Sequence, residues 1–358
     1  MFKATSKKYE RSFLGNYLFE KLVSESHPLR ILSEIADFSR MDEDLKHLYS
    51  EKGQRAYSPA MMIRISILKD LYNISDERVI QMIKENIPAR MYAGISLESK
   101  VPDPSDLTYF RRRLGEENFQ DLFTRTLAIA KENGLQLGDI VLIDSTHSEA
   151  KINQKTQNKT KDEKHNDRDA KFAYKNANKT FFGYKHHSAI ENNHNIIVAV
   201  QTTPGNVYDG SKLEDVMEEV LENIAKPEIV CADKGYDDKN NHEYLEKQDI
   251  FSAIILKDTR LQTKDKQFKQ FDKNGNDNKY LQQYFDPRCE QGQKERYRVE
   301  QSYAEMKNYH GLRRSKYLGL QKNQIQAYLT ATVYNLKHIL TFVNDNISSR
   351  KLNSAFKT

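Results

Sequence analysis

Residues 141–144 read Val-Leu-Ile-Asp and residues 229–233 read Ile-Val-Cys-Ala-Asp, so two short apolar runs each stop at an aspartate. Each run is typical of a buried strand. A helical stretch further along contains Glu300, with Arg296 four residues before it and Lys307 seven residues after it. Two strands that stop at Asp and one helical Glu predict three carboxylates at one sheet edge. Hard divalent cations take such oxygen ligands, and two of them can activate a nucleophile and stabilise the leaving oxygen in phosphodiester chemistry.

The order of elements from Asp139 onward predicts β, β, β, α, β, α, β, α. The strands are expected over residues 141–145, 181–190, 196–200, 229–232 and 251–256, and the helices after a capping box at Ser211-Lys-Leu-Glu214, near Tyr244 and around Glu300. The helix after the hairpin serves as the crossover that makes the fourth strand parallel to the first. The ribonuclease H-like fold has this element order, and its first and fourth strands are neighbours. The predicted fold class is therefore α/β, a ribonuclease H-like mixed sheet with flanking helices, preceded by an all-α N-terminal domain.

The N-terminal part, residues 1–138, is predicted to be a helical DNA-binding domain. Ser58-Pro59, Ser75 and Ser105 are expected to open helices, since serine caps helix N-termini and proline is favoured at the first helical position. A further helix is expected over residues 119–131, ending before Gly134. The helix that Ser105 opens contains Arg111, Arg112 and Arg113, which are candidate DNA phosphate contacts. The alternative is that these arginines only solvate a helix face.

Residues 139–318 are predicted to form the catalytic domain, and residues 319–358 a C-terminal helix packed on it. The catalytic domain would carry a basic insert, 151–179, and a polar insert, 257–292. The basic insert holds nine Lys or Arg and four Asp or Glu, an excess that equals the net charge of +5 of the whole chain. It is read as an exposed, mobile phosphate-contacting surface, or else as a solvated lysine-rich loop without a partner.

Composition excludes several classes of protein. The 358 residues include no apolar run approaching the ~18 residues of a membrane span, and the N-terminus lacks the apolar core of a signal peptide. Cys231 and Cys289 are the only cysteines and form no CxxC pair, which argues against a disulfide framework and a zinc site. The chain is therefore expected to be cytoplasmic and to have no membrane partner.

Two alternatives concern the metal ligands. Glu305 is a rival third carboxylate, but it lies about 140° round the helix from Glu300. His186 and His187 resemble a metal-binding pair, yet adjacent residues on a strand point to opposite faces, which favours a core or surface histidine.

Several motifs in order resemble those of the DDE transposases of bacterial insertion sequences, across nearly the whole chain. Arg296, Glu300 and Lys307 fit the R(3)E(6)K spacing of that family. The other matching stretches are Tyr57-Ser58-Pro59-Ala60-Met61-Met62, Pro102-Asp103-Pro104-Ser105, Arg111-Arg112-Arg113-Leu114, Asp144-Ser145-Thr146, Phe182-Gly183-Tyr184-Lys185, Thr203-Pro204-Gly205-Asn206 with Asp209 beyond, and Ala232-Asp233-Lys234-Gly235-Tyr236. The first three of these stretches resemble the helical domain associated with the family, and the rest its catalytic motifs.

The resemblance implies metal-dependent cleavage of DNA at the terminal inverted repeats of a mobile element and strand transfer into target DNA by direct transesterification. Asp144, Asp233 and Glu300 would be both catalytic residues and metal ligands, holding two Mg²⁺ ions, for which Mn²⁺ could substitute. No nucleotide cofactor is needed, because each phosphodiester broken is matched by one formed.

The implied partner is double-stranded DNA, as terminal repeats and as target. The need to hold two ends together implies a homodimer in the synaptic complex. Arg296 and Lys307 are expected to contact phosphates that flank the metal site. Tyr184 and Lys185 are expected near the catalytic edge, also as DNA contacts, from the resemblance alone.

Two features depart from the family pattern. Gln293 stands where a tyrosine often precedes the R(3)E(6)K residues, and the chain has no Trp, on which some similar transposases stack a flipped base. Whether cleavage leaves a hairpin therefore stays open. Two other functions also stay open: a domesticated or decayed relative that binds DNA without cutting it, and a structure-specific nuclease on the same fold.

Overall fold

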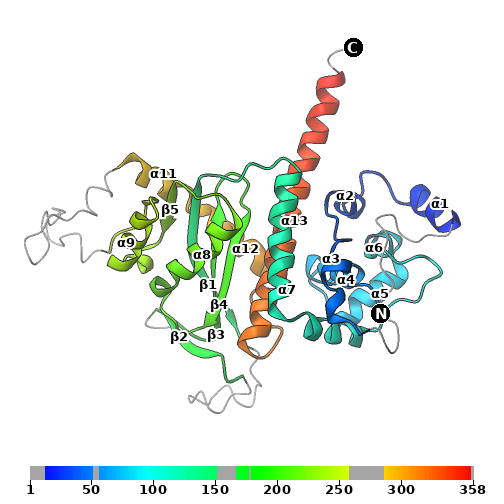
Figure 1. Cartoon of the computed structure of the whole chain (residues 1–358), viewed down its shortest axis with the longest axis horizontal. Helices are drawn as coiled ribbons and strands as arrows, with labels where there is room; N and C mark the ends of the chain where they lie inside the picture. The colour runs from blue at the N-terminus through cyan, green and yellow to red at the C-terminus, as the bar shows by residue number, and fades with distance from the viewer. Residues whose placement is uncertain (1–12, 51–55, 151–166, 177–178, 258–285, 356–358) are drawn as a thin grey trace, which may run out of the picture. The chain divides into compact units, whose positions relative to one another are not determined.

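The computed structural model describes residues 13–50, 56–150, 167–176, 179–257 and 286–355 (Figure 1). The chain divides into two compact units. The helical unit comprises Met1–Leu135, Tyr309–Gly311 and Tyr328–Thr358. The sheet unit comprises Gln136–Asn308 and Leu312–Ala327.

The sheet unit contains the strands and most of the helices that were predicted for the catalytic domain. Its strands are β1 (Ile140–Glu149), β2 (Lys171–Asn176), β3 (Lys179–Glu191), β4 (Ile197–Pro204), β5 (Ile229–Ala232) and β6 (Phe251–Ser252). Its helices are η4 (Asp209–Lys212), α8 (Leu213–Asn223), η5 (Lys234–Tyr236), α9 (Lys239–Lys247), α11 (Pro287–Glu295) and α12 (Tyr297–Tyr309).

The described strands form one mixed sheet of six strands in the order β2-β3-β1-β5-β6, with β4 also paired to β3. β3 runs antiparallel to β1, β2 and β4, whereas β5 runs parallel to β1 and β6 runs parallel to β5. The path β4-β3-β1-β5-β6 is the ribonuclease H-like order, which confirms the predicted fold class. The crossover from the hairpin to β5 passes through α8, as parallel pairing requires.

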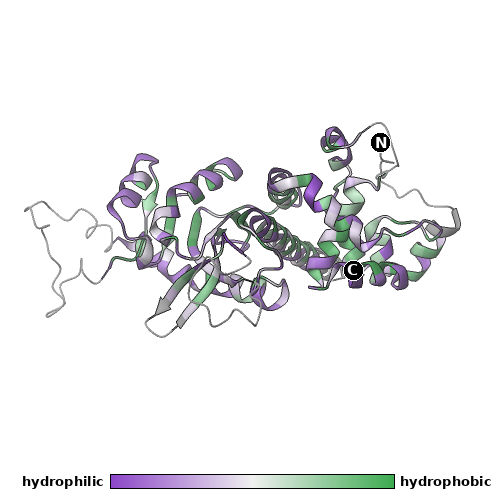
Figure 2. Cartoon of the chain, turned by 90° about the horizontal axis from the view of Figure 1, so that it is seen from below, coloured by the Kyte–Doolittle hydropathy of each residue, from purple (hydrophilic) through white to green (hydrophobic). Residues whose placement is uncertain are grey.

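β1 and β5 lie in the interior of the sheet unit. Val141, Leu142 and Ile143 are all buried, as expected for strands covered on both faces. α8 packs on β3 and β4, and α11 packs on β1 and β5. Figure 2 shows hydrophobic residues along the strands and hydrophilic residues on the outer sides of the shorter helices.

β1 is longer than its apolar run, which predicted a strand that stops at residue 145. The strand continues to Glu149 because β3 pairs with it over its whole second half, as far as Glu149 opposite Gly183. Asp144 therefore ends the apolar run and the pairing with β5, but it lies inside β1. The polar residues that follow it gave no apolar signal for this continuation.

Other parts of the sheet unit also differ from the predictions. The basic insert 151–179 is only partly described, and Lys171–Asn176 within it is strand β2 rather than a loop. Most of the polar insert 257–292 lies outside the described residues, but Pro287–Glu295 is helix α11, capped by Asp286 and begun by Pro287. The predicted capping box at Ser211 is wrong, because α8 begins at Leu213 without a side-chain cap and the Ser211 hydroxyl donates to the carbonyl of Tyr208.

The helical unit confirms the predicted all-α character of the N-terminal part. Its elements are α1 (Phe13–Leu22), α2 (Pro28–Ile35), α3 (Met41–Asp44), η1 (Lys46–Leu48), α4 (Pro59–Leu71), α5 (Asp76–Glu85), α6 (Ile87–Ala93) and α7 (Pro104–Glu132). Ser58 and Ser75 cap α4 and α5 as predicted, each accepting from a backbone N–H three residues on. α4 is buried nearly all round, since its neighbours α3, α5, α6 and α7 surround it.

Helix α7 combines the two helices that were predicted over this stretch. Its cap is Asp103, in a capping box with Asp106, rather than Ser105. The break between the two predicted helices falls at Gly115, where φ is 70° and ψ is −178°, a conformation essentially restricted to glycine. Gly134, with φ at 87°, follows the end of α7, as predicted for a helix stopped by glycine.

The last helix, α13 (Leu320–Ala355), is shared between the two units. Residues up to Ala327 belong to the sheet unit, and Tyr328–Thr358 belong to the helical unit. A buried hydrogen bond from Asn335 to Thr126 and stacking of Tyr328 on Phe123 hold this part against α7. The packing of residues 319–358 on the catalytic domain stays a prediction. Among the described residues, no helix has the length and apolar character that a membrane crossing needs.

Candidate active site

Asp144 and Asp233 lie side by side, as the two apolar runs predicted. The parallel pairing of β1 with β5 ends at Ile143 opposite Ala232, so the next residue of each strand is one of the aspartates. The pKa of Asp144 is raised to about 6, chiefly by burial and in smaller part by the negative charges of Asp233 and Asp209. The N–H of Ser145, which donates to Asp144 Oδ1 at 2.7 Å, and the charge of Arg296 act in the opposite direction.

Asp233 is held by the turn that follows it. Its Oδ1 accepts from the N–H of Gly235 at 2.7 Å and caps the short helix η5. A Cβ at position 235 would lie 2.8 Å from this same oxygen, so glycine is needed for the carboxylate to sit here. Asp233 is thus an N-cap, the ordinary role of an aspartate before a turn, and its position beside Asp144 makes it a candidate ligand as well.

Asp209 is a third carboxylate at this edge, and it lies close enough to Asp144 to raise its pKa. The sequence analysis placed Asp209 in a family motif without giving it a role. Its Oδ1 accepts from Lys185 Nζ at 2.9 Å, and Lys185 also donates to the carbonyl of Val207 at 2.9 Å. Lys185 was predicted to contact DNA, but in the structure its ammonium anchors this carboxylate.

Glu300 is not assembled with the two aspartates. Its side chain is exposed in the first turn of α12. Within the described ranges, no group of three or more His, Cys, Asp or Glu side chains is arranged to hold a metal ion. The structure therefore brings two of the three predicted carboxylates together and leaves the third on a neighbouring helix.

The helix that carries Glu300 is nevertheless fixed to the site on both sides of this residue. The hydroxyl of Tyr303 donates to the backbone carbonyl of Asp144, and the charge of Arg296 acts on the Asp144 carboxyl. Glu300 and Tyr303 are three residues apart on α12, and Arg296, the C-cap residue of α11, lies four residues before Glu300. Because residues three apart are neighbours on a helix surface, Glu300 lies beside Tyr303, whose hydroxyl reaches the Asp144 carbonyl.

Two tyrosines at the site were missed by the sequence reasoning. Burial raises the pKa of both Tyr236 and Tyr303 well above the usual value, and the Asp144 and Asp209 carboxylates raise both further. The Tyr236 hydroxyl has no hydrogen-bond partner among the described residues. The sequence feature that could have identified Tyr236 is its place in the Asp233-Lys234-Gly235-Tyr236 motif. For Tyr303 the only such feature is its position on the helix that carries Glu300.

Tyr184, which was expected to contact DNA, lies in the core of the sheet unit. Its ring is fully buried and its hydroxyl donates to Asp167 Oδ1 at 2.7 Å. Successive residues of a strand point to opposite faces, so Tyr184 and Lys185 cannot both reach the carboxylate edge. Lys307, by contrast, is half-buried and acts electrostatically on His186.

His186 and His187 are core histidines rather than a metal pair. Burial is the largest cause that lowers their pKa values, to about 3 and about 4, so both rings are neutral near pH 7. His186 bonds to Thr202 and Ser148, whereas His187 bonds to Thr203. The different partners reflect the opposite faces of β3.

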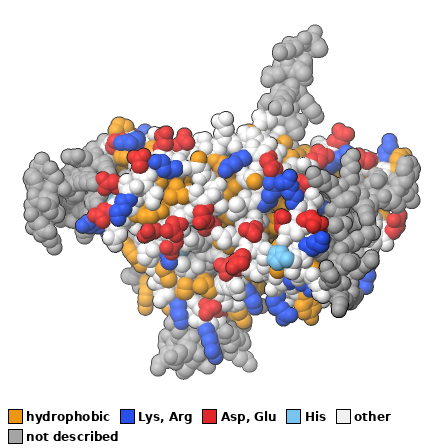
Figure 3. Space-filling view, in the orientation of Figure 1, with side chains coloured by type: hydrophobic (Ala, Val, Ile, Leu, Met, Phe, Trp, Pro, Cys, Tyr) orange, Lys and Arg blue, Asp and Glu red, His pale blue; other side chains and the backbone are white. Residues whose placement is uncertain are grey.

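The arginine triplet on α7 separates into two kinds of residue. Arg111 donates to both carboxylate oxygens of Asp76 and is 11% exposed, so it is part of the packing of α7 on α5. Arg112 and Arg113 are exposed and lie over the rings of Tyr109 and Tyr49 at 5.8 and 4.5 Å. Figure 3 shows basic and acidic side chains intermixed on one face of the molecule.

Comparisons with known proteins identify the family of the chain. The likeness to solved structures is low: a piggyBac transposase synaptic complex with hairpin DNA has a TM-score of 0.42 at 10% identity, covering 89% of this chain and 73% of that one. A Mos1 transposase paired-end complex with left transposon end has a TM-score of 0.19 at 11% identity, covering 66% and 74%. Residues 136–336, more than half of the chain, match the Transposase DDE domain, and residues 17–113 match the Transposase domain (DUF772). The chain therefore belongs to the DDE transposase family, whose domain implies transposase activity.

Proposed function

We propose that this chain cleaves DNA at the terminal inverted repeats of a mobile element and joins the freed ends to target DNA. The observation that carries the proposal is the pairing of β1 with β5, which puts Asp144 beside Asp233 inside the Transposase DDE match. We assign Asp144, Asp233 and Glu300 as the catalytic carboxylates, with residues 1–138 as the DNA-binding part.

The charge at this edge fits a divalent cation. Burial is the main cause that raises the pKa of Asp144 to about 6, and the negative charges of Asp233 and Asp209 contribute, so a cation among these carboxylates would offset both burial and mutual repulsion. Glu300 is exposed, and the structure shows no hydrogen bond or ion pair for it in the described part of the chain. Its side chain is thus available to complete an oxygen ligand set. We propose Mg²⁺, with Mn²⁺ as a substitute, and two ions per site.

The chemistry consists of two displacements at phosphorus. When bound, the metal ions would polarise the scissile phosphate and favour deprotonation of the attacking group. In the first step water attacks phosphorus, and the P–O bond to the 3′ oxygen breaks, leaving a 3′ hydroxyl. In the second step that 3′ oxygen attacks a target phosphate and displaces a target 3′ oxygen, which takes up a proton. One P–O bond forms for each one that breaks, so no energy-supplying cofactor is required.

The residues around the carboxylates have distinct tasks. Arg296, at the end of α11, and Lys307, on α12, lie on either side of Glu300 in the chain and would contact the phosphates next to the scissile one. Lys185 holds Asp209, and Tyr303 holds α12 against the Asp144 strand. We propose a homodimer in the synaptic complex, so that two DNA ends are held together. The buried, unpaired Cys231 and Cys289 are compatible with the reducing cytoplasm.

A cleavage assay tests the proposal directly. Purified protein with Mg²⁺ is expected to cut DNA that carries the matching terminal repeats, and Asp144→Asn is expected to abolish cutting while DNA affinity stays unchanged. Asp139→Asn is the matched control, because Asp139 is exposed just before the same strand and is expected to leave cleavage intact. Equal cleavage by Asp144→Asn and wild type would refute the mechanism.

The same assay separates the alternatives. A structure-specific nuclease would cut equally well without the terminal repeats, and a domesticated relative would bind them without cutting. The mass of the complex in solution, with and without a pair of end oligonucleotides, tests the dimer.

A further inference from the structure

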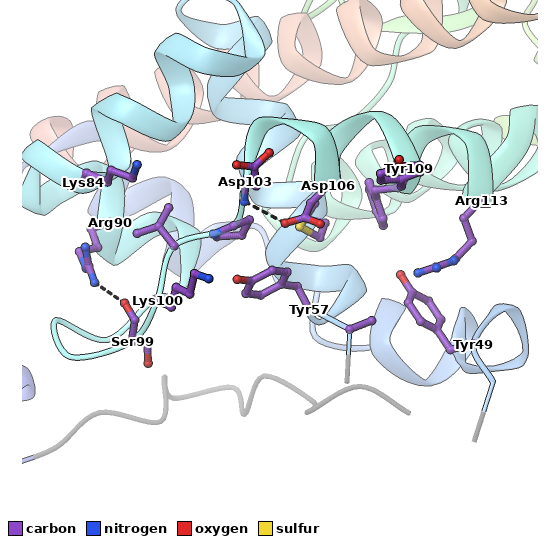
Figure 4. A pocket seen from close by; sticks show the side chains of 15 residues that line it. Tyr49, Tyr57, Lys84, Arg90, Ser99, Lys100, Asp103, Asp106, Tyr109 and Arg113 are labelled. Carbon is purple, nitrogen blue, oxygen red and sulfur yellow. Dashed lines mark hydrogen bonds between the residues drawn. The ribbon is translucent and has the colours of Figure 1, made fainter. Parts of the chain in front are cut away.

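The helical unit contains a pocket of about 540 Å³ that the proposed chemistry does not use (Figure 4). A volume of this size lies in the range of roughly 300–1,000 Å³ that is usual for small-molecule and cofactor sites. Buried Met62, Val101 and Phe110 contribute apolar lining. Most of the remaining lining residues are aromatic or charged.

Tyrosine rings line the pocket. Tyr57 lies in its middle, and Tyr49 and Tyr109 lie on the side of Arg113 (Figure 4). Tyr109 is 57% exposed. Exposed aromatic faces stack well on nucleobases, at about 1–3 kcal/mol per base, whatever the sequence.

The cations of the pocket fall into two groups. Arg90 is a wall residue, because its guanidinium donates to the carbonyls of Ser96, Leu97 and Ser99 at 2.7 to 3.1 Å. Lys84 and Lys100 are exposed, and the structure shows no hydrogen bond or ion pair for either among the described residues. These two lysines can contact phosphates beside the pocket.

Two carboxylates complete the lining and argue against a bare phosphate as the ligand. Asp103 Oδ1 accepts from the N–H and hydroxyl of Ser105, and Asp106 Oδ2 accepts from the N–H of Asp103. The second oxygen of each carboxylate can accept from the amino group of a base, as Asp does with cytosine. Acceptor carboxylates and exposed lysines in one pocket suit a nucleotide, whose base can donate to the carboxylates while its phosphates contact the lysines.

We propose that this pocket binds one unpaired nucleotide of the DNA on which the protein acts. The base stacks on Tyr57, its amino group donates to Asp103 or Asp106, and the flanking phosphates contact Lys84, Lys100 and Arg113. This proposal depends on the proposed function in one respect only, namely that the ligand is DNA. Because the carboxylates accept from amino groups, adenine, cytosine and guanine are preferred over thymine.

Fluorescence anisotropy with two duplexes tests the pocket, one fully paired and one with a single bulged adenosine in the same sequence. Wild type is expected to bind the bulged duplex about tenfold more tightly. Tyr57→Ala is expected to remove this preference while affinity for the paired duplex stays unchanged. Tyr109→Ala, at an exposed position, is the second variant should Tyr57→Ala fail to fold. Tyr72→Ala, an exposed tyrosine of the same unit outside this pocket, is the matched control.

A wild-type protein without preference for the bulge would overturn the proposal, as would a preference that survives in a folded Tyr57→Ala or Tyr109→Ala. A bulged thymidine that binds as tightly as adenosine would overturn the role of the carboxylates. Asp144→Asn does not touch the pocket and should keep the preference. Loss of cleavage with the preference retained would therefore count against the proposed function alone.

Discussion

Glu219 is a buried carboxyl on α8 that should make the stability of the sheet unit depend on pH. It is 5% exposed, and its Oε1 has no hydrogen-bond partner among the described residues. Burial raises its pKa to about 8, although the backbone N–H of Val200 donates to the carboxyl and lowers it in part. Replacement by glutamine keeps the shape of the side chain and removes the charge.

The direction and size of the effect follow from the two pKa values, 4.5 in the unfolded chain and about 8 in the folded protein. Between them the folded protein holds a proton that the unfolded chain has released. The free energy of unfolding therefore falls as pH rises through this window and becomes level above the folded pKa. At pH 7 the loss relative to acid pH amounts to about 3 kcal/mol, since each tenfold change in proton concentration contributes about 1.4 kcal/mol.

Urea unfolding followed by far-ultraviolet circular dichroism, at about pH 5 and about pH 7.5, measures this loss. Glu219→Gln is expected to match wild type within about 0.5 kcal/mol at the lower pH and to exceed its stability by about 3 kcal/mol at the higher. Glu218→Gln, at the exposed neighbouring position, should show no such pH-dependent gain. If the difference between Glu219→Gln and wild type were the same at both pH values, burial of a titrating carboxyl would not be its cause.

The other predictions concern the DNA-processing residues. Tyr303→Phe removes the hydroxyl that donates to the Asp144 carbonyl and is expected to slow cleavage about tenfold. It should also raise the Mg²⁺ concentration needed for half-maximal cleavage, with DNA affinity unchanged. An unchanged dependence of cleavage on Mg²⁺ would show that Tyr303 only contributes packing. Arg111→Ala breaks the pair with Asp76 and should destabilise the helical unit by about 2 kcal/mol in thermal or urea unfolding. Arg112→Ala should leave stability unchanged and lower the slope of log affinity against log salt by about 1, measured by titrating DNA binding with salt; the reverse pattern for the two arginines would contradict their assignment.

Much of the sheet unit was predictable because its signals are local. Apolar runs of four or five residues bounded by turn signals indicated β1 and β5, and the order of the elements was enough to select one topology. The adjacency of Asp144 and Asp233 follows from that topology alone, since both residues directly follow paired runs. Strand β2 and helix α11 were missed because their sequences are polar and their stability comes from pairing with β3 and packing on β5.

The roles of single side chains depended on contacts between distant residues. Tyr184 and Lys185 are neighbours in one motif, and only the pairing of β3 decides that one meets Asp167 and the other Asp209. In the sequence, Arg111 cannot be distinguished from Arg112 and Arg113. Only the folded structure shows that it pairs with Asp76, which is 35 residues away in the chain.

The amino-acid sequence by itself determined the element order, the ribonuclease H-like topology, the two adjacent aspartates and the family, because these depend on local apolar runs and motif spacing. Only the tertiary structure decided which cations are exposed, that Asp209 joins the carboxylates, and that Tyr303 holds the Glu300 helix beside β1. Each of these depends on contacts between side chains of different strands and helices. Such contacts form only when the elements pack, so local sequence patterns do not reveal them.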